Sequence, residues 1–361
     1  MRKICAILAC IILITASCSM PISENEKTEF NFPLRQSVEV QVDHNIEKMA
    51  ISDTWVAIAI PSKLTAINLM GNTVIWTLNG FLLDKDSDMQ IVDNMLIATT
   101  YNEILVIGEA GDRQSINLRP DTGDVVQLVA VYKNYLYAIR GVNWDLEVYD
   151  IAKNTYLWGT WVGRGQTDVF YDSQTGVVYV ITPQSVNAFE NSSGKLLWQQ
   201  QTTVKHSSFD SGILYLCEET DSAKTFGCVA LNVSDQKELW KKEFTLGAGE
   251  EIYQLSVIQN MLVATTRYGY FAINKSNGEQ IWHTGADDIF YNKPVEFNNI
   301  LYAKGSSGKI YAFSLVDGSV IGYKLLEKNP TFQSKYDASQ RVFKLSDGIA
   351  VTANKTIRIF K

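Results

Sequence analysis

The side chains that could do chemistry are few in this chain and widely separated. The chain has three histidines, at His44, His206 and His283. Two carboxylate pairs, Asp287-Asp288 and Glu250-Glu251, lie in segments expected to link structural units, where solvated charge is the common explanation. The sequence has no nucleophile elbow, no paired histidine metal motif and no EF-hand calcium loop. We therefore expect a protein that is not an enzyme and that has no cofactor and no metal.

The N-terminal segment predicts export and lipid anchoring. Arg2 and Lys3 precede an apolar run, Ile4–Ile14, that is too short to span a bilayer and is typical of a secretion signal. The following Thr15-Ala16-Ser17-Cys18 resembles the bacterial lipobox, whose cysteine is lipidated and becomes the new N-terminus. The alternative is an ordinary cleaved signal with an incidental cysteine.

This interpretation divides the chain into a lipoprotein signal peptide (1–17), a lipidated tether (18–29) and one folded domain (30–361). Acyl chains at Cys18 would hold the protein on a bacterial membrane. Ser19, in place of aspartate, favours the outer membrane if the host is a diderm; otherwise we expect the outer face of the cell membrane.

The five cysteines have different expected fates. Cys5 and Cys10 are removed with the signal, and Cys18 carries the lipid. Cys217 and Cys228 flank an expected hairpin tip, where they can face each other in an oxidising compartment. We predict a disulfide between them, with two free thiols in a surface hairpin as the alternative.

A repeat dominates the rest of the chain. A small residue is followed ten positions later by tryptophan at Ala66–Trp76, Val148–Trp158, Ala188–Trp198, Ala230–Trp240 and Ala272–Trp282, and by glycine at Ala312–Gly322. The interval between the Val148 and Ala188 copies is 40 residues, a period typical of an array of like units.

Each copy spans the hairpin between two expected strands. In the Ala272–Trp282 copy the turn contains Gly278 at the seventh position, where a residue tolerant of positive φ is needed. Two more strands precede each copy, so each unit is a four-stranded antiparallel sheet, and such sheets stack radially into a β-propeller. We expect the five repeat tryptophans to be packing residues, with the alanine leaving space for the indole of a neighbouring blade.

The repeat resembles that of the PQQ-like (quinoprotein) propellers, with a small residue first, Asp or Asn third, Gly seventh and Trp eleventh. The resemblance covers nearly the whole mature chain and implies an all-β propeller. The quinoprotein dehydrogenases of this kind have an adjacent cysteine pair, which this chain lacks. The resemblance therefore implies the fold without implying a quinone cofactor.

We count eight blades. They are expected at 46–80, 88–119, 126–162, 168–202, 207–244, 253–285, 293–326 and 341–361. The last has only three strands, so we expect its outer strand to come from Phe30–Phe32 and Ser37–Val40, closing the ring. Seven blades is the alternative, because 88–119 has Ile116 where tryptophan is expected.

Charge argues against nucleic acid as a partner. The net charge is −7, and no basic stripe is present. We expect a monomeric propeller that contacts a membrane through its lipid and has a protein partner in the cell envelope.

The candidate binding face comes from propeller geometry. Tips between second and third strands emerge on the same side as the linkers between blades, and here these segments hold Arg140, Trp144, Trp161, Arg164, Arg267 and Tyr268. Tryptophan, tyrosine and arginine are enriched at interface hot spots. The alternative is that each is partly buried under a loop.

The layout resembles the BamB-like outer-membrane assembly lipoproteins, which implies a protein–protein scaffold. A second hypothesis is a module that binds a carbohydrate or small ligand in its central channel. Polar positions expected along that channel are Gln90, Gln127, Asp168, Gln254, Glu296 and Arg341.

Overall fold

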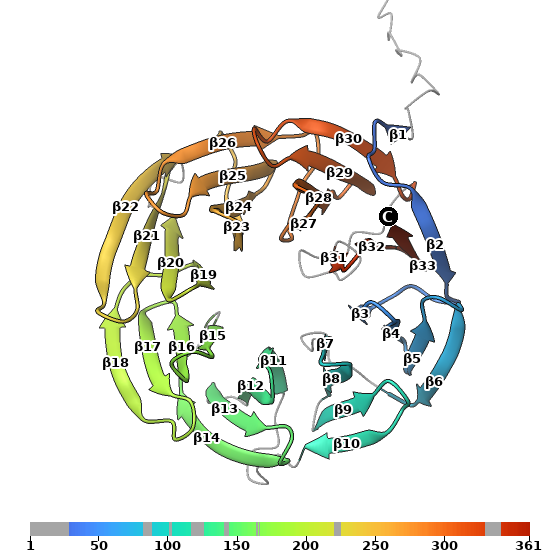
Figure 1. Ribbon diagram of the computed structural model, residues 1–361, viewed down its shortest axis with the longest axis horizontal. Coiled ribbons are helices and arrows are strands. Elements are labelled where there is room, and N and C mark those ends of the chain that lie inside the picture. Colours follow the sequence, from blue (N-terminus) through green and yellow to red (C-terminus); the bar gives the residue numbers. More distant parts are fainter. Residues whose placement is uncertain are drawn as a thin grey trace, which may run out of the picture.

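The repeats form a ring of eight antiparallel sheets in the computed structural model (Figure 1). The structure describes residues 29–81, 89–100, 103–116, 126–140, 144–163, 165, 167–219, 225–328 and 341–361. The signal peptide, Cys18, most of the tether and Arg164 lie outside these residues. The predicted all-β propeller of eight blades is confirmed, and the seven-blade alternative is wrong.

Within each blade the chain runs from the inner to the outer strand. Blade one comprises β3 (Lys48–Ile51), β4 (Trp55–Ile60), β5 (Lys63–Asn68) and β6 (Thr73–Asn79); blade two comprises β7 (Met89–Val92), β8 (Met95–Thr99), β9 (Ile104–Gly108) and β10 (Arg113–Ile116). Blade three comprises β11 (Val126–Tyr132), β12 (Tyr135–Arg140), β13 (Asp145–Asp150) and β14 (Thr155–Trp161); blade four comprises β15 (Asp168–Asp172), β16 (Val177–Thr182), β17 (Ser185–Glu190) and β18 (Leu196–Gln201).

The second half repeats the pattern. Blade five comprises β19 (His206–Asp210), β20 (Ile213–Glu219), β21 (Thr225–Asn232) and β22 (Lys237–Thr245); blade six comprises β23 (Ile252–Ile258), β24 (Met261–Thr266), β25 (Gly269–Asn274) and β26 (Gln280–Gly285). Blade seven comprises β27 (Val295–Phe297), β28 (Ile300–Lys304), β29 (Lys309–Ser314) and β30 (Val320–Leu325); blade eight contains β31 (Val342–Leu345), β32 (Gly348–Ala353) and β33 (Thr356–Phe360).

The N-terminal segment closes the ring as expected, but it serves two blades. β2 (Gln36–Gln41) pairs with β33 and is the missing outer strand of blade eight. β1 (Glu29–Phe30) instead pairs with β30 and adds a fifth strand to blade seven. Phe30 therefore does not join blade eight, which corrects that part of the prediction.

The core is divided among the blade interfaces. Among the described residues there are eight buried apolar clusters, one at each contact between neighbouring blades. Ile116, where blade two lacks the repeat tryptophan, is 2% exposed and packs in the cluster between blades two and three. Since each blade buries both faces only against its neighbours, the whole ring is the stable unit.

The repeat tryptophans fix the spacing between blades. The indole nitrogens of Trp76, Trp158, Trp240 and Trp282 donate to the carbonyl oxygens of Glu109, Asn191, Lys275 and Leu315, at 2.6–3.1 Å. Each acceptor lies in the outer turn of the next blade, so these four tryptophans each link two neighbouring blades.

Space for the indole comes from glycine and not from alanine. Ala272 lies directly across from Trp282 of its own blade, so it does not receive the preceding indole. A Cβ on Gly278 would lie 2.6 Å from Trp240. With φ of 74°, Gly278 supplies both the turn conformation and the gap, which corrects the expected role of the alanine.

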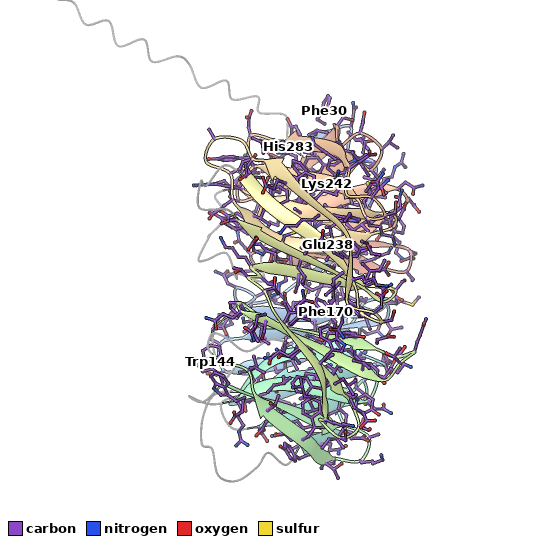
Figure 2. All side chains as sticks on the ribbon, turned by 90° about the vertical axis from the view of Figure 1, so that its left-hand side faces the viewer. Phe30, Trp144, Phe170, Glu238, Lys242 and His283 are labelled. Carbon is purple, nitrogen blue, oxygen red and sulfur yellow. A yellow bond between two sulfur atoms is a disulfide. The ribbon has the colours of Figure 1, made fainter. Side chains whose placement is uncertain are left out.

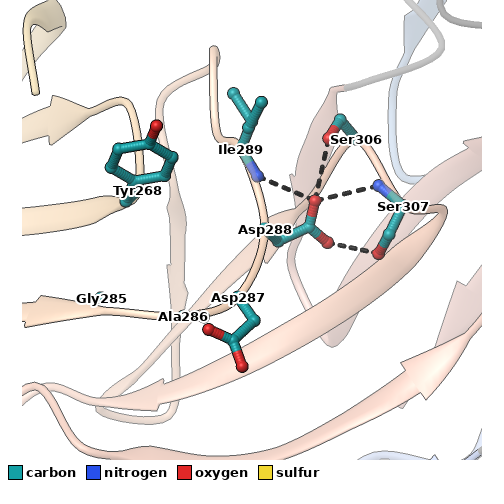
Figure 3. Close-up of a pocket in the computed structure, with 8 residues that line it drawn as sticks. All are labelled: Tyr268, Gly285, Ala286, Asp287, Asp288, Ile289, Ser306 and Ser307. Atoms are coloured by element: carbon teal, nitrogen blue, oxygen red, sulfur yellow. Dashed lines mark hydrogen bonds between the residues drawn. The ribbon is translucent and has the colours of Figure 1, made fainter. Parts of the chain in front are cut away.

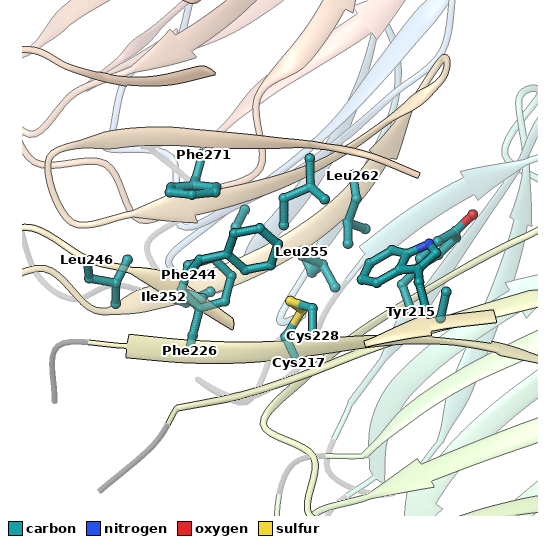
Figure 4. Close-up of a cluster of buried hydrophobic side chains, with 14 residues drawn as sticks. Tyr215, Cys217, Phe226, Cys228, Phe244, Leu246, Ile252, Leu255, Leu262 and Phe271 are labelled. Atoms are coloured by element: carbon teal, nitrogen blue, oxygen red, sulfur yellow. A yellow bond between two sulfur atoms is a disulfide. The ribbon is translucent and has the colours of Figure 1, made fainter. Parts of the chain in front are cut away.

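The disulfide prediction is confirmed at the interface of blades five and six. Cys217 and Cys228 are directly opposed on β20 and β21, with Cα atoms 4.2 Å apart, and form a disulfide. Both are 1% exposed and lie beside Phe226 in the apolar cluster that Figure 4 shows. The pair is thus part of the core, and the surface-thiol alternative is wrong.

Candidate binding surface

Three candidate residues of blade three come together at strand ends on one side of the ring. Arg140 ends β12, Trp144 precedes β13 and Trp161 ends β14. Asp145 is opposed by Arg140 on one side and by Trp161 on the other, so these three residues form a cross-strand row. Directly opposed residues share a face, with Cβ atoms about 4.5–5.5 Å apart.

The exposure of these residues differs sharply. Trp161 is 71% exposed, whereas Arg140 is 7% exposed and its Nη1 lies 3.5 Å from the Glu147 Oε2. Arg140 is therefore held in a buried ion pair, and its burial does not support the interpretation of this residue as a surface contact.

Trp144 is intermediate between these cases. Its φ of 57° turns the chain into β13, and its carbonyl oxygen accepts from the Val162 amide at 3.0 Å. The side chain is half-buried and packs against the cluster between blades three and four. Partial burial under a loop, the alternative interpretation, applies to Trp144 but not to Trp161. Figure 2 shows Trp144 at one edge of the ring seen from the side.

Beside these tryptophans lies a hollow of about 810 Å³ between blades three and four, which we call the blade-three hollow. The described residues that line it are Trp144, Asp145, Trp161, Val162, Gly163, Thr182, Pro183, Gln184, Ser185, Gln199 and Gln201. Sequence analysis did not identify the blade-four residues, because their proximity depends on how neighbouring blades pack. The run Gln199–Gln201 was the available signal.

The blade-six residues form a second patch. The guanidinium carbon of Arg267 lies 5.5 Å from the ring centroid of Tyr268, within cation–π range, and Tyr268 is 38% exposed. The Tyr268 carbonyl oxygen accepts from the Ala286 amide, and that of Arg267 accepts from Phe290, at 2.9 and 3.0 Å. The linker to blade seven therefore holds this tip in place. Blades four and five lie between the two patches around the ring.

The carboxylate pair beside this patch is only half solvated. Asp287 is exposed, but Asp288 is 7% exposed and accepts four hydrogen bonds (Figure 3). The donors are the amide of Ile289, the hydroxyl of Ser306, and the amide and hydroxyl of Ser307. Asp288 thus ties the linker to the second-to-third strand tip of blade seven, which corrects the expectation of solvated charge.

Glu250 has the same role one blade earlier. It is 8% exposed and accepts from the Gly247 amide at 2.7 Å and from the Thr266 hydroxyl at 2.9 Å. His283 lies 3.2 Å from the same carboxylate, whereas Glu251 is exposed. Both buried carboxylates have structural partners, so we assign neither to catalysis.

Two polar side chains expected along the central channel, those of Gln254 and Glu296, have hydrogen-bond partners. Gln254 accepts from the Lys293 amide at 3.2 Å, and Glu296 accepts from the Lys344 ammonium at 2.9 Å. Burial, together with the Asp168 carboxylate, raises the pKa of Tyr132 to about 12, so this phenol stays neutral at physiological pH. These hydrogen bonds give Gln254 and Glu296 a structural explanation.

Metal and membrane sites can be addressed for the described ranges alone. There, no cluster of three or more His, Cys, Asp or Glu side chains could hold a metal ion. Across those same ranges, no helical segment has the length and apolar character needed to cross a bilayer.

Comparison with known proteins supports the repeat type. The family model described as outer membrane protein assembly factor BamB matches residues 182–346, from the end of β16 into blade eight. No curated protein sequence matches the chain.

Solved structures share the fold at low identity. The computationally designed Ika8 protein superposes with a TM-score of 0.70 and 13% identity, covering 90% of this chain and 99% of that chain. BamB from Moraxella catarrhalis superposes with a TM-score of 0.63 and 12% identity, covering 91% of this chain and 99% of that chain. Sqt1 of Saccharomyces cerevisiae superposes with a TM-score of 0.65 and 10% identity, covering 91% of this chain and 97% of that chain. These similarities show the fold alone.

Proposed function

We propose that this PQQ-like β-propeller is a non-catalytic envelope lipoprotein that acts as a protein–protein scaffold in outer-membrane protein assembly. The matched family model is named for that process, and the similar structure from Moraxella catarrhalis is also called BamB, which supports the proposal. The observation that carries it is the side of the ring with the strand tips and linkers, where Trp161 and Tyr268 expose aromatic surface on rigid supports. We call this side the loop face.

The supports make both aromatics suitable contacts. Trp161 belongs to a row with Asp145 and the buried Arg140, and Tyr268 is stacked by Arg267 on a tip held by two backbone hydrogen bonds. Ordered side chains lose little conformational entropy on binding. Trp144 and Arg164 extend the blade-three patch in the proposal.

Anchoring is proposed at Cys18, through lipidation after removal of residues 1–17. Labelling with a palmitate analogue in a bacterial host tests it. Wild-type protein should carry the label and fractionate with membranes, and Cys18→Ala should lose both properties. Label retained by Cys18→Ala would refute this site.

The scaffold role is tested by crosslinking in the native membrane, affinity capture and mass spectrometry. We expect one membrane complex to be recovered repeatedly, with Tyr268→Ala and Trp161→Ala each lowering its yield. A control, Val316→Ala, removes an 81% exposed side chain from an outer turn of blade seven. Recovery of the propeller alone, in repeated experiments, would contradict a stable scaffold.

A further inference from the structure

The blade-three hollow has a row of side-chain amides that the fold does not use. Gln199 and Gln201 alternate with Gln200 along β18, so their side chains project from the same face, about 7 Å apart. Both line the hollow, and Gln184 joins them from the preceding tip. All three are exposed, and none of their side-chain amides hydrogen-bonds to a described residue. Each offers both donors and an acceptor.

An aromatic wall faces the same space. The indole of Trp161 is 71% exposed, and the half-buried Trp144 lies beside it. Gly163 has a φ of 81°, so glycine lets the chain turn beside the Trp161 ring. A large flat apolar surface next to free amides suits a ligand with one apolar face and a polar perimeter.

The charges of the described residues that line the hollow favour a neutral ligand over an anionic one. Among its described lining residues there is no lysine, arginine or histidine, and the single carboxylate is that of Asp145. The closest cation in the cross-strand row, Arg140, is buried and paired with Glu147. Among these described residues, a phosphate or uronate would meet the Asp145 carboxylate without a compensating cation.

The volume is that of a small-molecule site. About 810 Å³ lies within the range of about 300–1,000 Å³ that is usual for ligand pockets. The buried hydroxyls of Thr182 and Ser185 hydrogen-bond to each other, at 3.0 Å, and so belong to the wall. Recognition then depends on the indole, the amides and one carboxylate.

From these observations we propose that the blade-three hollow binds a neutral sugar. The C–H face of a pyranose packs on Trp161, and its hydroxyl groups exchange hydrogen bonds with Gln199 and Gln201, while Asp145 accepts one more. This site lies outside the central channel, where Gln254 and Glu296 already have partners. It does not require the scaffold role, and its test uses no protein partner.

Saturation-transfer NMR and calorimetry on the purified ring, residues 29–361, test the proposal with cellobiose, maltose and N,N′-diacetylchitobiose. We expect at least one to bind with a Kd near 1 mM, about −4 kcal/mol. Trp161→Ala should weaken binding at least tenfold, and the double variant Gln199→Ala/Gln201→Ala at least fivefold. Gln200→Ala is the matched control, because it lies on the same strand but projects to the other face.

Thermal unfolding of each variant shows whether it is folded, and Trp161→Phe keeps an aromatic platform if alanine disturbs the loop. Binding that Gln200→Ala preserves and the other variants lose supports the site. The proposal is overturned if none of the three disaccharides binds at 10 mM. It is also overturned if binding survives both Trp161→Ala and the double glutamine variant, because the sugar would then lie elsewhere.

Discussion

Phe32 packs edge-on against Phe360, with ring centroids 5.5 Å apart and ring planes at 71°. This contact lies at the one interface whose repeat copy ends in glycine. Gly322 stands in the tryptophan position, and a Cβ there would be 2.2 Å from the Phe30 carbonyl oxygen. Phe32 lies in the same cluster as Ala312, the small residue of that copy. Blade seven has no tryptophan at the repeat position, and Phe32 of the N-terminal segment supplies an aromatic ring at this interface instead.

Replacing Phe32 should therefore open the ring between blades seven and eight. Phe32→Ala removes a side chain that is 9% exposed, and we expect the free energy of unfolding to fall by about 3 kcal/mol. Phe30→Ala is the control, because Phe30 is 41% exposed and should cost less than about 1 kcal/mol. Urea unfolding measures both. Equal losses would show that Phe32 does not replace the docking residue.

Gly278 has a positive φ and leaves space for the Trp240 ring, and comparison with Gly212 can separate these two contributions to stability. Gly278→Ala meets an unfavourable φ and the Trp240 ring, so we expect a loss of about 3 kcal/mol. Gly212 has a similar φ of 76° but nothing within 4 Å of an added Cβ, so Gly212→Ala should cost only about 1 kcal/mol. If the two variants lose the same stability in chemical denaturation, the indole contact contributes nothing.

The adjacent residues Asp288 and Asp287 should differ in how much their replacement lowers stability. Asp288→Asn places an amide group where four donors converge, and we expect a loss of about 2 kcal/mol. Asp287→Asn changes an exposed carboxylate and should stay within about 0.5 kcal/mol of wild type. Melting temperatures at neutral pH compare them. An Asp288→Asn variant with the melting temperature of wild type would mean that the hydrogen bonds of Asp288 are not needed for stability.

The Cys217–Cys228 disulfide should resist reduction while the protein is folded, because both sulfurs are buried among apolar side chains. Without denaturant, a thiol-specific alkylating reagent should label neither cysteine after mild reduction. Changing both cysteines to alanine should lower the free energy of unfolding by about 2–3 kcal/mol. Rapid labelling of the folded, reduced protein would contradict the burial.

The architecture was predictable because it is encoded locally. The Ala272–Trp282 spacing and the Gly278 turn lie within one hairpin, so the sequence was sufficient to predict the blade and the repeat. The pairing of Cys217 with Cys228 followed from two strands adjacent in the chain.

The surface was less predictable, since it depends on contacts between blades. Arg140 and Trp161 are equally good candidates in the sequence. In the structure Arg140 is buried and paired with Glu147, whereas Trp161 is exposed. Likewise, Gln199 and Trp161 line the same hollow only because blades three and four pack side by side. Asp288 is buried and Asp287 is exposed because Ser306 and Ser307, at a tip of blade seven, donate hydrogen bonds to Asp288.

The scaffold role is tested most directly by site-specific photo-crosslinking in the native membrane. A photoreactive residue replaces Tyr268 or Trp161 on the loop face, and in parallel Met70 or Val316, which lie in exposed outer turns. The account predicts that Tyr268 and Trp161 yield adducts with the same protein, and that Met70 and Val316 do not. Adducts formed only from Met70 or Val316, or equally from all four positions, would contradict the loop face as the docking surface.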